Sequence, residues 1–315
     1  LTPSERYGVF VNFGQDLGSR THFAFKGVYN RRNSRNQAAP IPLFVGPDSG
    51  NGNLLDTISI DVTNPFNPFG NRFWSPTGAP NPDGTPRLTG TPAAVSISNK
   101  RLTDLPDRTA TVTTSVYRGV AGLRGKLSGS WSWEAAVLYS AARVIDHEAG
   151  PSRKSLLIQA INQTDPARAF NPFTRTFAVQ GGSLVVTGPY RNPASVLATF
   201  GSEFIRNGIT KLGSGDFRAS GDVLPLWSGN ALGGAFGGEF RYEAFDDYRP
   251  PYAGLNPPGS GLDPTANDFL GFSPNSDTHG NRHVAAAYAE AVVPLVGRKL
   301  ALPFVQSLEL SASAR

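Results

Sequence analysis

The sequence predicts an all-β protein whose long antiparallel strands run up and down in chain order. Three observations predict it: apolar and polar residues alternate with period 2 over ten or more residues, tight breaks are rich in Gly and Asn, and short connections alternate strictly with long ones. A strand of a globular protein has about five or six residues, whereas a tilted strand that crosses a bilayer needs roughly 9–11. The runs in this chain fit transmembrane strands better than soluble ones.

The clearest hairpin spans residues 216–245 and turns at residues 227–230. Before the turn the apolar side chains are Phe217, Ala219, Val223 and Trp227, and after it they are Leu232, Phe236, Phe240 and Tyr242. Charged residues take the opposite face, namely Arg218, Asp222, Glu239, Arg241 and Glu243. We expect the apolar stripe to face lipid and the charged stripe to face a hydrated lumen, because Arg or Lys at a bilayer midplane costs about 2–4 kcal/mol.

Three further strand pairs follow the same pattern. The first covers residues 6–30, with a turn at 15–19. The second joins a run that begins near residue 111 to the run 131–139, where Glu134 lies on the polar face. The last pairs residues 283–294 with 306–315, although the periodicity of the first of these runs leaves its outer face unassigned. Eight strands are therefore expected.

Three long segments without sustained periodicity separate these pairs. They are dense in Asn, Pro and Gly and cover about residues 31–109, 147–207 and 246–281. All of them fall at one end of the predicted strands, and the tight turns fall at the other. Outer-membrane barrels have this asymmetry, with short periplasmic turns and longer extracellular loops. The predicted fold is thus a partial up-and-down transmembrane β-barrel, about eight strands of a larger barrel.

Two short helices are expected inside the second long segment. Residues 155–162 (SLLIQAIN) place two apolar side chains four apart, and the Pro at 166 follows a residue that avoids helical geometry. Residues 192–200 (NPASVLATF) begin with Asn192 as the predicted N-cap and Pro193 at the first helical position.

Composition narrows the function classes. The 315 residues include 35 Gly and 26 Pro, only 17% are charged, and there is no Cys, which excludes disulfides and thiolate metal sites. No run approaches 18 apolar residues, so no transmembrane helix is predicted. The net charge of +5 comes without a run of five like charges, so a nucleic-acid partner is not indicated. No nucleophile–base–orienter group is recognisable, and we do not expect an enzyme, a catalytic residue or a cofactor.

Several stretches carry a family resemblance. They are DVTNPFNPFG (61–70), YRGVAGLRGKLSGSWSWEAAVLYS (117–140), IQAINQTDPARAFNPF (158–173), NPASVL (192–197), RHVAAAYAEAVVPLVG (282–297) and SLELSASAR (307–315). In these residues and in their order the chain resembles the TonB-dependent outer-membrane receptors over essentially all 315 residues. The resemblance implies that residues 1–315 are part of a β-barrel domain of about 22 strands closed by a plug.

The resemblance also implies a function and partners. These are energy-coupled uptake of a scarce or bulky nutrient (a siderophore, oligosaccharide, peptide or similar), contact with outer-membrane lipid, and coupling to the inner-membrane TonB complex in a Gram-negative bacterium. The sequence departs from the family pattern because it shows no plug, no TonB-binding segment and no terminal aromatic strand. We therefore expect a barrel fragment. A passive outer-membrane pore and a secreted all-β enzyme are the alternatives.

Two clusters in the long segments are candidates for ligand binding. Arg72, Phe73 and Trp74 combine a cation with aromatic rings, which suits an anionic or sugar ligand. Asp246, Asp247, Tyr248 and Arg249 end a strand at the same rim and could bind a polar ligand. Loop packing is the competing interpretation of the first cluster, and a solvated rim with an aromatic girdle is that of the second.

Other motifs favour structure over binding. The Asn-Pro-Phe triplets at 64–66, 67–69 and 171–173 are expected to start turns and to anchor loops through Phe. DSGNGN (48–53) lacks the closing Glu of a calcium loop, so a plain loop is expected. The four His residues show no paired metal spacing, and no metal site is predicted.

Overall fold

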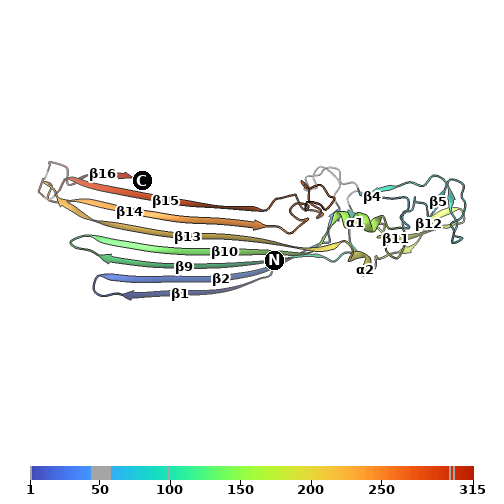
Figure 1. Cartoon of the computed structure of the whole chain (residues 1–315), viewed down its shortest axis with the longest axis horizontal. Coiled ribbons are helices and arrows are strands. Elements are labelled where there is room, and N and C mark those ends of the chain that lie inside the picture. The colour runs from blue at the N-terminus through green and yellow to red at the C-terminus, as the bar shows by residue number, and fades with distance from the viewer. Residues whose placement is uncertain (1, 44–57, 98–99, 298, 301) are drawn as a thin grey trace.

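A computed structural model describes residues 2–43, 58–97, 100–297, 299–300 and 302–315. Its main body is an eight-stranded antiparallel sheet in which successive long strands are neighbours. The strands are β1 (Ser4–Asp16), β2 (Thr21–Ala38), β9 (Arg108–Lys126), β10 (Ser132–Ser152), β13 (Gly201–Pro225), β14 (Ala231–Tyr248), β15 (Thr278–Val296) and β16 (Leu308–Ala314). The predicted eight-stranded, up-and-down arrangement is confirmed. The sheet is open, with β1 and β16 as its edges (Figure 1).

The strands are longer than their hydrophobic periodicity predicts. The prediction ends the second strand near Asn30, but β2 continues to Ala38, and its pairing with β9 holds to the partners Ala38 and Arg108. β13 has 25 residues, more than twice what a bilayer crossing requires. Alternation of apolar and polar residues stops where both faces become polar, whereas backbone pairing continues. The strands therefore extend past the region that periodicity can detect.

Three tight turns close the hairpins at one end of the sheet, and each begins with Leu. The Leu17 N–H donates to the Thr21 carbonyl at 2.7 Å, and Leu127 and Leu226 donate to the carbonyls of Trp131 and Asn230, both at 2.8 Å. Each turn also contains a glycine with positive φ: Gly18 at 79°, Gly129 at 64° and Gly229 at 80°. Residues with a Cβ atom rarely adopt a positive φ angle, whereas glycine adopts it without a steric penalty. The break predicted at 227–230 is thus a turn.

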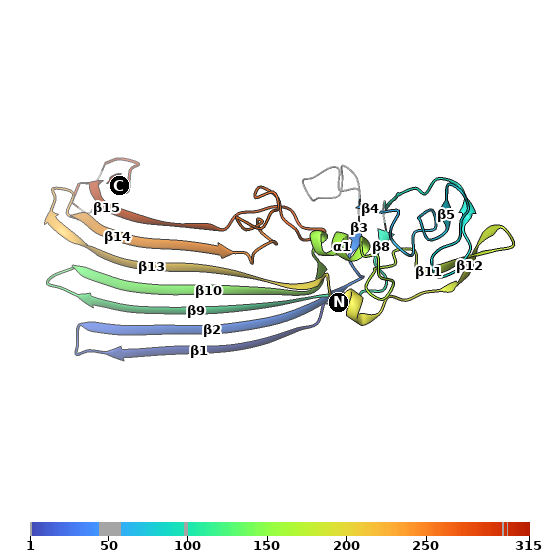
Figure 2. The same ribbon diagram turned by 45° about the vertical axis from the view of Figure 1, so that its right-hand side comes forward.

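The long connections gather at the opposite end of the sheet (Figures 1 and 2). We call the described residues of 39–107, 153–200 and 249–277 the loop unit. It contains two helices, α1 (Lys154–Ile161) and α2 (Ala194–Leu197), and a hairpin of β11 (Arg175–Gln180) and β12 (Ser183–Pro189). The remaining strands are β3 (Pro42–Leu43), β4 (Ile58–Ile60), β5 (Trp74–Ser75), β6 (Leu88–Thr89), β7 (Val95–Ile97) and β8 (Lys100–Arg101).

The larger of two hydrophobic core clusters in the described residues lies in the loop unit; the smaller one joins Ala253 and Phe269 of this unit to Phe204 of β13. All three connections contribute buried side chains to the larger cluster. The first supplies Ile41, Leu43, Ile58, Ile60, Ile97, Leu102 and Leu105, the second Leu157, Ala160, Ile161, Phe170, Val196 and Phe200, and the third Leu270. Segments more than 200 residues apart in the chain therefore fold together, so the loop unit is a packed body and not a set of independent loops.

A buried carboxylate ties the second connection to the third. Asp268 is only 4% exposed and accepts hydrogen bonds from Arg153 Nε at 2.8 Å, from Ser155 Oγ at 2.6 Å and from the Ser155 N–H at 2.8 Å. The Arg153 guanidinium also lies 3.6 Å from the centroid of the Tyr252 ring. A charged group this deeply buried needs such partners to offset its desolvation.

The helices follow the prediction in part. α1 matches the expected 155–162, and α2 is confirmed but shorter than expected. The predicted N-cap of α2 is wrong, because Pro193 occupies that position and no side chain caps the helix. Asn192 instead donates its amide to the Asp104 carboxylate at 2.6 Å and to the Asn171 carbonyl. Among the described residues, no helix has both the length and the hydropathy to cross a membrane.

We predict that Leu157→Ala lowers the free energy of unfolding of the loop unit by about 2–5 kcal/mol, because Leu157 is fully buried in the shared core. The measurement is native-state hydrogen exchange of loop-unit amides. Leu127→Ala makes the same change at a half-exposed turn position and should leave that exchange unaltered. Equal effects of the two substitutions would contradict a shared core.

Candidate functional site

The register of the sheet assigns every strand residue to one of two unlike faces, since cross-strand partners share a face. One row of partners crosses seven strands without a polar side chain: Phe13, Phe25, Ala121, Val137, Gly215, Phe240 and Ala285. We call the surface that contains this row the apolar face and the other surface the polar face. The two strands of the 216–245 hairpin present their apolar sets to the same side, as predicted. The face that was unassigned for 283–294 is now fixed by Ala285.

The apolar face is most exposed on β1, β10, β13 and β14. Its large side chains include Val9 at 59% exposure, Val11 at 48%, Phe13 at 49%, Val137 at 61%, Phe217 at 41%, Phe236 at 49% and Phe240 at 53%. Soluble monomers rarely expose contiguous apolar patches larger than a few hundred Å². An exposed apolar surface of this kind is typical of a contact site for an apolar partner.

Polar residues limit the apolar face toward the loop unit. Tyr29 and Tyr117 are cross-strand partners whose ring centroids lie 4.9 Å apart. Lys211 on β13 lies in the same row, and the next row toward the loop unit contains Arg31 on β2 and Arg143 on β10. Aromatic rings followed by charges are the sequence of residues found at the edge of a membrane-facing surface.

The limit of the apolar face runs obliquely to the register. Toward the loop unit, the apolar face extends to Tyr7 on β1 and to Ala285 on β15. Ala285 lies in the same row of cross-strand partners as Phe13 of β1. Phe13 is six residues from Tyr7, and six strand steps separate β1 from β15, so the limit shifts by roughly one residue per strand. With a rise of about 3.3 Å per residue and a strand spacing of about 4.8 Å, the inclination is roughly 35°. Barrel strands tilt by a similar angle, about 35–45°.

The polar face carries ion pairs from β10 to Arg315, which follows β16; two of them join neighbouring strands and one reaches across β15. Arg218 pairs with Glu134, Arg282 pairs with Glu243, and Arg315 Nη2 lies 3.2 Å from Glu239. Within β14, Arg241 Nε lies 3.0 Å from Glu243. Five of the six charged residues predicted for a lumen wall are paired in this way. For the sixth, Asp222, only backbone contacts with the turn residues Ser130 and Trp131 are found in the described chain.

The first predicted ligand cluster is largely built into the loop unit. Phe73 is 6% exposed, and its ring packs edge-on against Phe177. The Trp74 indole N–H donates to the Pro68 carbonyl at 2.9 Å. Arg72 is the exposed member, and its guanidinium lies 2.7 Å from the Asp83 carboxylate. This geometry favours loop packing for the two aromatic residues.

The second predicted cluster lies where β14 ends. Asp247 is 7% exposed and receives Arg206 Nε and Nη2 on its two oxygens, both at 2.7 Å. Arg249 Nη2 lies 3.7 Å from the same carboxylate, while Tyr248 is exposed and Asp246 is half-buried. The two clusters do not meet. The first lies at β5, at the far end of the loop unit, and the second lies at the end of β14, where the sheet joins the loop unit (Figures 1 and 2).

The Asn-Pro-Phe triplets are structural, as predicted, but Asn does most of the anchoring. Asn64, Asn67 and Asn171 are all fully buried. Their side-chain oxygens accept the N–H of Phe66 at 2.8 Å, of Phe69 at 3.0 Å and of Phe173 at 2.8 Å. Their amide nitrogens donate to backbone carbonyls, and Asn64 reaches Ile161 at the end of α1. The ring of Phe69 is 51% exposed.

A second turn motif was missed by the sequence reasoning. In three Asp-x-Thr segments an Asp carboxylate accepts both the N–H and the hydroxyl of the Thr two residues later. The pairs are Asp61 with Thr63, Asp83 with Thr85, and Asp263 with Thr265. These hydrogen bonds lower the pKa of each carboxyl. The pKa of Asp83 falls to about 2, mainly through the Thr85 hydroxyl, then the Thr85 N–H, then Arg72.

The potential metal ligands of the described residues are scattered. No group of three His, Cys, Asp or Glu side chains is arranged in this part of the chain to hold a metal ion. His22 lies 2.7 Å from Asp16, and His147 lies 3.1 Å from Glu203. The DSGNGN segment at 48–53 lies outside the described residues.

Comparison with known proteins assigns no family: no family model and no curated protein matches the chain. The functional argument therefore depends on the two faces of the sheet and on the loop unit.

We predict that Asn64→Ala lowers the stability of the loop unit by about 2–3 kcal/mol, because the Phe66 N–H and the Ile161 carbonyl lose a buried partner. Hydrogen exchange of the α1 amides measures the loss. Asn71→Ala removes the same side chain from an exposed position and should have no such effect. A similar change in both variants would contradict an anchoring role for Asn64.

We predict that Asp83 titrates near pH 2 in a carboxyl ¹³C NMR titration. Because its pKa is lower in the folded state, its contribution to stability is complete above the unfolded value of about 3.9 and is lost as the pH falls toward 2. Thr85→Val should raise the pKa of Asp83 more than Arg72→Gln does. The reverse order would show that the ion pair, and not the turn, sets the pKa.

Proposed function

We propose that this chain forms part of the wall of a transmembrane β-barrel in the outer membrane of a Gram-negative bacterium. The exposed apolar face is the observation that carries the proposal. In water such a surface would favour aggregation, whereas against lipid its exposure carries no penalty. The opposite face holds paired charges that need water, which a hydrated lumen supplies.

The dimensions of the apolar face support the same proposal. On β10 it runs from Trp133 to Ala141, which is nine residues of strand. A strand tilted in a bilayer needs roughly 9–11 residues. The tyrosines near its loop-side limit, Tyr29, Tyr117, Tyr139 and Tyr242, match the aromatic belts at membrane surfaces.

The unpaired edges of the sheet support a barrel larger than these eight strands. Each inner strand is paired on both sides, but β1 and β16 each have one unpaired side. Unpaired backbone groups in hydrocarbon cost several kcal/mol each. We therefore propose that additional strands pair with these edges, in keeping with the barrel of about 22 strands that the family resemblance implies.

We infer that the barrel belongs to a receptor of the TonB-dependent type that takes up a bulky nutrient. The loop unit supports this inference over a passive pore, because a pore does not require three connections that share a core and buried ion pairs. A preorganised body at the outer rim suits ligand capture, since ordering has been completed before binding. Energy from the inner-membrane TonB complex would reach the barrel through a plug domain.

We predict that Val137→Arg reduces insertion into lipid vesicles, because the arginine would face the hydrocarbon near its midplane at a cost of about 2–4 kcal/mol. Leu138→Arg changes the next residue, whose side chain lies on the polar face, and should insert like the unchanged protein. Urea-dependent folding into vesicles of the complete barrel that contains these strands, followed by tryptophan fluorescence, measures the difference. Equal behaviour of the two variants would contradict a lipid-facing role for the apolar face.

Two observations separate the receptor from its alternatives. A receptor requires a plug domain encoded in the same reading frame, and a passive pore does not. A secreted all-β enzyme would be extracted from cells without detergent, and either membrane protein would require it. Detergent-free extraction would end both membrane interpretations, and a complete frame without a plug would end the receptor.

A further inference from the structure

The charges of the polar face are divided unevenly between its two halves. From β10 to β16, five acidic side chains of this face have an arginine partner, namely Glu134, Glu148, Glu239, Glu243 and Asp247. On β1, β2 and β9 the only acid on this face is Asp16, and it pairs with His22. The same three strands present six exposed cations, which we call the basic track: Arg6, Lys26, Arg32, Arg118, Arg124 and Lys126. In the described structure none of the six has an ion-pair partner or a side-chain hydrogen bond.

The basic track runs from the row that contains Arg6, Arg32 and Thr114 to Lys126 at the end of β9. On β9 it contains Arg118, Arg124 and Lys126. On β2 the register places Lys26 opposite Val120, between Arg118 and Arg124. Alternate residues of a strand are about 7 Å apart. The rows of cations are two or four residues apart, which is about 7 or 13 Å, and a chain of anionic groups, or one anion moving stepwise, can bridge these spacings.

The loop-side end of the track is electrostatically unfavourable by itself. Arg6 and Arg32 are direct cross-strand partners on the same face. Like charges placed opposite each other destabilise a sheet. Their arrangement does not stabilise the fold, and an anion between them would remove the repulsion.

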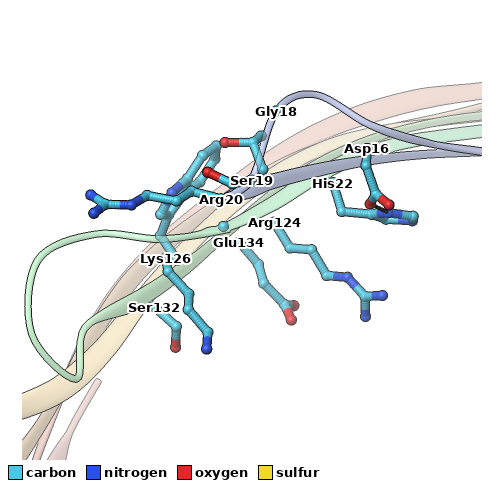
Figure 3. Close-up of a pocket in the computed structure, with 12 residues that line it drawn as sticks. Asp16, Gly18, Ser19, Arg20, His22, Arg124, Lys126, Ser132 and Glu134 are labelled. Carbon is cyan, nitrogen blue, oxygen red and sulfur yellow. Dashed lines mark hydrogen bonds and ion pairs between the residues drawn. The ribbon is translucent and has the colours of Figure 1, made fainter.

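At the turn end the track opens into a hollow of about 490 Å³ (Figure 3). Arg124 and Lys126 line it and project to the same side as Glu134. The two acids in the lining are already engaged, because Glu134 pairs with Arg218 and Asp16 with His22. Arg20 also lines the hollow, but its side chain projects in another direction. The hollow therefore offers a solute two cations of the basic track that have no ion-pair partner, in a space large enough for a small molecule.

We propose that the basic track binds a small solute with several phosphate or carboxylate groups and guides it along the polar face. Guanidinium groups form paired, charge-assisted hydrogen bonds with both kinds of oxyanion. The six positive charges of the basic track are complementary to a solute that carries several negative charges. The inference rests on the proposed function in one respect, that the polar face borders water, and it adds the chemical class of the solute.

The test is isothermal titration calorimetry of the full chain in neutral detergent micelles, with inorganic pyrophosphate and with tricarballylate as probes. We expect saturable binding that weakens as salt is raised. Arg124→Gln and Arg118→Gln should each weaken it about tenfold, the effect of losing one charge-assisted contact. Lys211→Gln removes an exposed cation from the other face and should leave the affinity unchanged.

Several results would overturn the proposal. They are an absence of saturable binding for both probes, equal weakening by Lys211→Gln, or binding to anionic phosphatidylglycerol vesicles that depends on Arg118 and Arg124 while the free probes do not bind. The last would identify a lipid headgroup as the occupant. If binding fails while the Val137→Arg and Leu138→Arg variants behave as expected, only this inference fails. If binding succeeds while those variants insert equally, the membrane proposal fails.

Discussion

Continuous backbone pairing across the eight-stranded sheet is the constraint on which the other features depend. Once the register is fixed, alternate residues must point to opposite faces, and a shift by one residue would exchange the two faces. The pairing holds for 18 consecutive partners between β9 and β10, from Ser132–Lys126 to Ala149–Thr109. The apolar face, the ion-pair rows and the basic track are all consequences of this register.

The molecule divides its stabilising interactions between two regions. The sheet has almost no buried side chains and is held by its backbone ladders, with exposed ion pairs that each contribute about 0–1 kcal/mol. The loop unit contains the packed core, and buried polar groups such as Asn64, Asn171 and Asp268 fix its irregular backbone. The stability of the sheet therefore depends on its backbone pairing and on the medium around it, whereas the stability of the loop unit depends on its own packed core.

Period-2 alternation predicted the strand number, the turn at 227–230 and the faces of residues such as Val137 and Glu134, because these are local properties. It could not predict what depends on distant partners. The Asn192 cap failed because Asp104 and Asn171 compete for that side chain. The burial of Phe73 depends on a hairpin about 100 residues later in the chain. The Asp-x-Thr turns, by contrast, are local and could have been found from their spacing.

The most direct test of the central claim is a cysteine scan of residues 133–142 on β10, which the absence of native cysteine makes free of background. Spin labels at each position would be examined in lipid vesicles for collision with oxygen and with a water-soluble nickel complex. The account predicts oxygen maxima at odd positions and nickel maxima at even positions. Access of nickel to the odd positions, or no alternation, would contradict a sheet with one face in lipid and the other in water.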